Sequence, residues 1–111
     1  MAAGGILKPH WFYVLLALAE GDRHGLAIAR DVQALSDGAV RLWPATLYGS
    51  LDDLRGRKWI EELAEHPEEE SERKRYYRLT RAGRAVLTDE AGRLGRLARL
   101  ARSRVRTGEA R

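Results

Sequence analysis

The stretch "LWPATLYGSL", residues 42–51, predicts a helix whose outer surface carries almost no bulky side chain. Pro44 suits the first turn, where its missing N–H would have no intrahelical partner, so the helix should run from about 44 to 57. At 100° per residue its buried face would hold three leucines: Leu47, Leu51 and Leu54. The opposite face would hold Ala45, Gly49, Asp52 and Gly56. A partner could therefore approach this helix closely from outside.

Length and composition are those of one globular domain: 111 residues, 44% apolar and 32% charged. The absence of cysteine excludes a disulfide frame and thiolate chemistry, and it agrees with a reducing compartment. The longest apolar run, residues 11–19, is far shorter than the roughly 20 residues that span a bilayer. The first residues lack the pattern of a signal peptide. We expect a cytoplasmic protein that makes no use of a membrane.

Hydrophobic periodicity and turn residues predict three further helices and two strands. The helices are expected at about 9–20, 24–35 and 81–106, and the strands at 59–63 and 75–80. Thr80 is a good N-cap for the last helix, and His24 should cap or pack at the start of the second. This order predicts a mainly α protein with a small β-hairpin. It would be a winged helix-turn-helix over residues 1–80, followed by one C-terminal dimerisation helix and tail over residues 81–111.

The bare outer face of the 44–57 helix suits a helix that lies in the major groove of DNA. Such docking requires close backbone approach and short polar side chains near the helix N-terminus. The flanks would carry Thr46 and Ser50 on one side and Tyr48 and Arg55 on the other. The same small residues are typical of a solvated surface, and Asp52 and Asp53 would repel phosphates. Both interpretations stay open for this helix alone.

Charge is distributed unevenly along the chain, whose formal net charge is +4. Residues 73–111 hold 13 Lys and Arg against three Asp and Glu, whereas residues 64–72 hold five Glu and no Lys or Arg. A basic segment suits a polyanionic partner such as nucleic acid, because each neutralised phosphate releases counterions. It suits an arginine-rich solvated helix equally well.

Three stretches together resemble the PadR family of transcriptional regulators: "LLALAEGDRHGLAIARDV", "LWPATLYGSLDDLRGRKWIEE" and "RKRYYRLTRAGR". The resemblance covers about residues 7–104. Its most specific parts are His24 with Gly25, "PATLYGSL" at 44–51 and "YYRLT" at 76–80 with Gly83, in the expected order and spacing.

This resemblance implies a homodimeric winged-helix protein, usually a repressor, that binds double-stranded DNA with the 44–57 helix in the major groove. The 64–74 hairpin would be the wing along the neighbouring backbone. A single C-terminal helix is similar to the shorter subgroup of the family. The expected DNA-binding residues are Pro44, Thr46, Tyr48, Gly49, Ser50, Arg55, Arg73, Lys74 and Arg75.

The sequence departs from the family pattern at three positions. Ala45 and Lys58 stand where the family usually has glycine, and Leu26 stands where it usually has tyrosine. Lysine in a turn that prefers positive φ would be strained unless the turn is rebuilt. The wing tip is also acidic, with Glu68, Glu69, Glu70 and Glu72. We expect this tip to project away from DNA while the basic base of the wing makes the contact.

The C-terminal helix has the apolar spacing of a coiled-coil-like seam, with steps of four and three residues. The seam would hold Leu87, Ala91, Leu94, Ala98, Ala101 and Val105, widened by Leu97 and Leu100. Packing against a second copy would cover it, with Trp11 and Leu15 of the first helix completing the interface. In the alternative arrangement, the helix folds back on its own domain.

Enzymatic chemistry is not expected. The histidines, His10, His24 and His66, lack the spacing of metal ligands, no glycine loop suits a phosphate, and no cofactor is indicated. The other function class that stays open is a winged-helix module for protein–protein contact without specific DNA binding. A small-molecule effector, as in other shorter members, would have to use Trp11, Phe12 or Leu15, because the C-terminal helix holds no aromatic residue.

Overall fold

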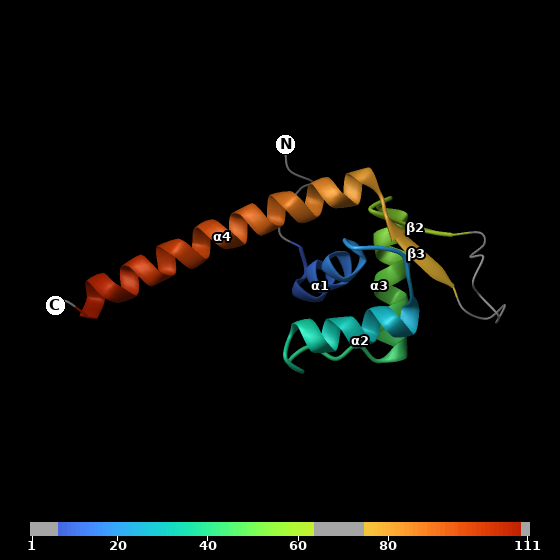
Figure 1. Ribbon diagram of the computed structural model, residues 1–111, viewed down its shortest axis with the longest axis horizontal. Helices are drawn as coiled ribbons and strands as arrows, with labels where there is room; N and C mark the ends of the chain where they lie inside the picture. The colour runs from blue at the N-terminus through green and yellow to red at the C-terminus, as the bar shows by residue number, and fades with distance from the viewer. Residues whose placement is uncertain (1–6, 64–74, 110–111) are drawn as a thin grey trace.

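The computed structural model describes residues 7–63 and 75–109 (Figure 1). Its elements are α1 (Pro9–Leu18), β1 (Arg23–His24), α2 (Gly25–Leu35), α3 (Pro44–Gly56), β2 (Ile60–Glu62), β3 (Tyr76–Leu79) and α4 (Arg81–Glu109). Each expected helix and strand is present, with ends shifted by a few residues. The predicted mainly α, winged-helix architecture is confirmed, and β1 is an addition to it.

The strands form one antiparallel sheet in the order β1-β3-β2. Ile60 pairs with Leu79 on one side of β3, and His24 pairs with Tyr76 on the other. Because β1 has only two residues, no alternating pattern could reveal it in the sequence. It nevertheless ties the start of α2 to the hairpin.

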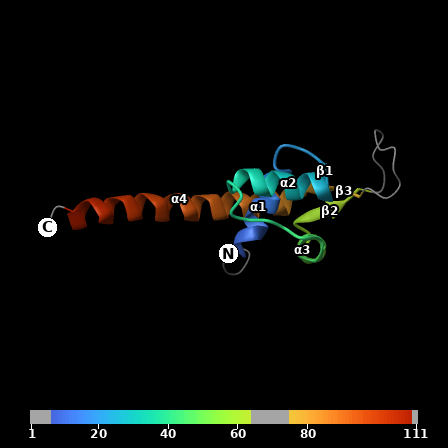
Figure 2. The same cartoon turned by 90° about the horizontal axis from the view of Figure 1, so that it is seen from below.

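The helix α4 leaves the domain after its first turns. Its N-terminal part packs against α1, whereas its C-terminal half extends away from the rest of the chain in two perpendicular views (Figures 1 and 2). The molecule is accordingly 62 Å long but only 32 and 23 Å across. Leu94, Leu97 and Val105 are exposed. The alternative in which this helix folds back on its own domain is therefore wrong.

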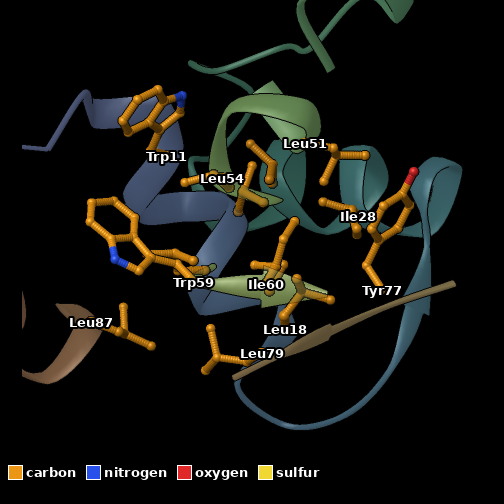
Figure 3. Packing of buried hydrophobic residues seen from close by; sticks show 14 of the residues in the cluster. Trp11, Leu18, Ile28, Leu51, Leu54, Trp59, Ile60, Tyr77, Leu79 and Leu87 are labelled. Carbon is orange, nitrogen blue, oxygen red and sulfur yellow. The ribbon is translucent and has the colours of Figure 1, made fainter. Parts of the chain in front are cut away.

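One apolar core joins the helices to the sheet (Figure 3). The central helix is α1, and its Trp11 meets Trp59 edge to face with 6.3 Å between the ring centroids. The expectation that Trp11, Leu15 and Leu87 lie at an interface between two chains is wrong, because the core of a single chain already buries all three. The residues at the start of α4 thus belong to the same core as those of 1–80.

Side chains cap the two helices that follow strands β1 and β3. At α2, Nδ1 of His24 accepts a hydrogen bond from the Ala27 N–H at 3.2 Å. At α4, the Thr80 hydroxyl accepts from the Gly83 N–H at 3.0 Å and donates to the Lys58 carbonyl at 2.7 Å. The capping roles predicted for His24 and Thr80 are confirmed.

Lys58 follows α3 in a left-handed conformation, with φ of 64°. A non-glycine residue there costs about 1–2 kcal/mol. The Trp59 N–H donates to the Leu54 carbonyl at 3.1 Å, as in a helix end that glycine normally forms. The turn is therefore kept rather than rebuilt, and the bond from Thr80 to the Lys58 carbonyl helps to hold it.

Gly83 lies directly against the backbone at the start of β2. A Cβ atom at this position would overlap the Trp59 carbonyl oxygen and would come within 2.8 Å of Leu79 Cδ1. Only glycine permits α4 to approach the hairpin this closely.

Gly83→Ala should lower the free energy of unfolding by about 3 kcal/mol or more, because the new methyl group meets a backbone oxygen that cannot rotate away. Gly92→Ala in the same helix is the control, since its nearest neighbour would be Arg96 Nη1 at 3.8 Å. That variant should gain up to about 1 kcal/mol from helix propensity. Urea unfolding at one protein concentration measures the free energy of unfolding of both variants. A Gly83→Ala protein as stable as the parent would contradict the close packing of Gly83 on the Trp59 carbonyl.

Candidate nucleic-acid interface

The helix-turn-helix consists of α2 and α3, and the N-terminal end of α3 lies on the far side of the domain from α4 (Figure 1). As predicted, Leu47, Leu51 and Leu54 are buried. The opposite face of α3, which holds Ala45, Gly49, Asp52 and Gly56, is exposed. A Cβ atom at either glycine would meet nothing within 4 Å, so the outer side of α3 is open.

The predicted DNA-contacting residues at the start of α3 do not all reach the surface. Pro44, Thr46 and Gly49 are exposed. Ser50 is only 4% exposed, so its prediction as a contact residue is wrong. Ser50 stands 60° from Leu47 around the helix, and the buried stripe is wide enough to include it.

Tyr48 is 45% exposed, but its ring also packs against the first residue of α2. A Cβ atom at Gly25 would lie 2.8 Å from Tyr48 Oη and 3.0 Å from Cε1. Gly25 therefore makes room for the tyrosine ring. Through this contact Tyr48 also sets the spacing between α2 and α3.

Arg55 is held in ion pairs rather than extended toward solvent. Its Nη1 lies 2.6 Å from Glu62 Oε1 on β2, and its Nη2 lies 3.9 Å from Asp52 Oδ1. Asp52, one turn earlier on α3, is thus an ion-pair partner of Arg55. Burial raises the pKa of the neighbouring Tyr77 hydroxyl, and the Glu62 carboxylate raises it further. The charge of Arg55 is therefore paired within the protein.

The wing can be described only at its base. Arg75 is exposed at the start of the returning strand. Arg73, Lys74 and the rest of the predicted 64–74 wing, including its glutamates, lie outside the described residues.

The apolar stripe of α4 is exposed beyond the domain. Its exposed members are Ala91, Leu94, Leu97, Ala98, Ala101 and Val105. The buried Leu87 stands on the same face, so the stripe continues the surface with which α4 packs on its own core.

Sequence reasoning did not single out Trp43, Arg41 and Arg30. Trp43 immediately precedes α3 and is 64% exposed. The Arg41 guanidinium lies over its ring, 5.7 Å from the centroid. The available signal was a tryptophan directly before a helix-starting proline, because a tryptophan side chain does not cap a helix.

Within residues 7–63 and 75–109, no three His, Asp or Glu side chains are grouped so that they could bind a metal ion. None of the described helices is long and apolar enough to cross a membrane.

Gly25→Ala should destabilise the protein by about 1–2 kcal/mol, because the methyl group displaces the Tyr48 ring. In a Tyr48→Ala background the same substitution should be neutral or stabilising. Urea unfolding of the two single variants and the double variant measures this coupling. Equal effects of Gly25→Ala in both backgrounds would show that the tyrosine does not occupy this place.

Comparisons with known proteins agree with this architecture. The model of the transcriptional regulator PadR-like family matches residues 14–89. An uncharacterised 37.1 kDa protein in transposon TN4556 of Streptomyces fradiae is 41% identical over 78 residues. These residues are 70% of this chain but 21% of that protein, so the chain spans about a fifth of its length.

Two solved structures are similar in fold. A PadR family transcription regulator from Clostridium difficile R20291 has a TM-score of 0.74 at 18% identity, covering 88% of this chain and 99% of that one. RosR of H. salinarum has a TM-score of 0.65 at 30% identity, covering 94% and 91%. Because the family model matches more than half of the chain, the protein belongs to the PadR-like family of transcriptional regulators.

Proposed function

We propose that this transcriptional regulator is a repressor that binds an inverted-repeat DNA operator as a homodimer, with α3 in the major groove. The observation that carries the proposal is the open outer face of α3 at the end of the domain opposite α4. A recognition helix needs such clearance, because the duplex must come within hydrogen-bond distance of short side chains.

Thr46 and Pro44 are the α3 side chains best placed for such a contact, since both are exposed in its first turn. Thr46 offers a hydroxyl to a base edge or a phosphate, and Pro44 offers an apolar surface. About one turn later, Gly49 has no side chain that would hinder the approach of the duplex. Tyr48 would act partly by contact and partly by fixing α3 on α2. Arg75 would reach the phosphates from the base of the wing.

A second copy of the chain is the proposed partner of the α4 stripe. A protruding helix with leucines exposed along one face is unfavourable in water, and a second α4 in two-fold symmetry would cover it. The same symmetry would present two copies of α3 to successive major grooves. The half-sites would then lie about 10 base pairs apart.

An effector has no assigned site in this proposal. Of the three residues on which a pocket between chains would depend, Trp11 and Leu15 are buried in the core, and Phe12 is half-buried against it. The described part of α4 holds no aromatic residue to replace them.

Selection of binding sequences from random duplexes provides the operator for the first test. Thr46→Ala should weaken operator binding by about 1–3 kcal/mol and relax the sequence preference at its contact position. The control Thr88→Ala makes the same chemical change on α4, where the hydroxyl donates to the Arg84 carbonyl at 2.9 Å. Fluorescence anisotropy of labelled duplexes measures both. If the selection enriches no sequence, the protein-interaction alternative replaces this proposal.

Leu94→Glu combined with Leu97→Glu should convert the dimer to monomers in sedimentation equilibrium, because two carboxylates would be buried in the seam. Operator affinity should fall as well, because a monomer can contact only one half-site. Ser103→Glu combined with Thr107→Glu adds the same charge to the opposite face of α4 and should leave the dimer intact. A parent protein that is already monomeric at micromolar concentration would rule out the dimer.

A further inference from the structure

A groove of about 540 Å³ lies between α2 and α3, beside the first turn of α3. Its lining includes Leu26, Arg30, Arg41, Trp43, Pro44 and Tyr48. Pro44 and Tyr48 belong to the proposed recognition surface, whereas the other residues lie outside it. The groove is therefore continuous with the surface proposed for DNA.

Trp43 is exposed here in a way that the fold does not require. Trp11 and Trp59 are only 5% and 7% exposed, whereas Trp43 is 64% exposed. Its side chain makes no capping hydrogen bond to α3. A large, flat apolar surface and an indole N–H donor are thus presented at the mouth of the groove.

The two arginines of the groove have uncompensated charge. Arg23, Arg55, Arg78 and Arg93 each form an ion pair with an aspartate or glutamate. Within the described part of the chain, neither Arg30 nor Arg41 has an acidic partner within 4.0 Å. Asp37 lines a neighbouring hollow with Arg30, which makes the Arg41 end of the groove the more favourable place for an anion.

We propose that this groove receives the sugar-phosphate backbone of the DNA strand beside the base pairs that α3 contacts. The Trp43 ring packs on a deoxyribose, and Arg41 and Arg30 neutralise the adjoining phosphate. This inference rests on the proposed function and adds a contact that the recognition motif does not contain. An apolar flat surface next to two guanidinium groups that have no carboxylate partner in the described part of the chain matches the alternation of sugar and phosphate along the backbone.

A backbone contact has a distinct signature, because it carries no sequence information. Loss of Trp43 or Arg41 should weaken the operator and an unrelated duplex by the same factor. Loss of Arg41 should also lower the slope of log K against log salt concentration by about 0.9 for each phosphate contact removed.

The test measures anisotropy of the selected operator and of a scrambled duplex over a range of salt concentrations. Trp43→Ala should weaken both duplexes about fivefold or more, because it removes about 1 kcal/mol or more of apolar burial. Arg41→Ala should weaken both and reduce the salt slope. Leu35→Ala removes an exposed apolar side chain outside the groove, and Arg78→Ala removes an arginine paired with Glu61, so these are the matched controls. Circular dichroism verifies that each variant is folded.

Tryptophan emission gives a second, independent measurement. Because Trp43 is the exposed tryptophan, duplex binding should shield it from iodide, and Trp43→Phe should abolish that protection. If Trp43→Ala binds the operator as tightly as Leu35→Ala does, the inference is overturned and the proposed function is left intact. A loss confined to the operator also overturns it, since the groove would then read sequence. A parent protein that binds no duplex contradicts the proposed function itself.

Discussion

The close approach of Gly83 to the Trp59 carbonyl is the contact on which the rest of the structure depends. Trp59 immediately precedes β2, Lys58 ends α3 in a left-handed turn, and Thr80 bonds to both of their carbonyls. One small cluster of backbone groups thus joins the end of α3, the hairpin and the start of α4. The conformational cost at Lys58 is offset by these bonds.

This junction gives α4 a fixed direction relative to α3. Leu87 then anchors the next turn in the core, and the buried Glu90 is held by Arg93 through bonds of 2.8 and 2.6 Å. These hydrogen bonds from Arg93 lower the pKa of the Glu90 carboxyl. In the proposed dimer, the same rigidity would set the separation of the two recognition helices, and hence the spacing of the half-sites.

The features that depend on residues close together in the sequence, namely the helices and their caps, could be predicted. The helices follow from apolar spacing, and the caps at His24 and Thr80 follow from residue type and position. Tertiary packing decides the rest. Ser50 is buried because the core stripe of α3 is wider than its three leucines, and Leu15 is buried because α1 lies at the centre of one chain. Trp43 stands in an irregular segment, where no periodicity could indicate its exposure.

Hydroxyl-radical footprinting of the protein on its selected operator tests symmetric binding by two recognition helices, because it reports where the backbone is covered without assuming which residue covers it. Binding by the proposed dimer should protect two segments related by a two-fold axis, on one face of the duplex and about one helical turn apart. A single protected segment without symmetry, or uniform weak protection of any duplex, would contradict it.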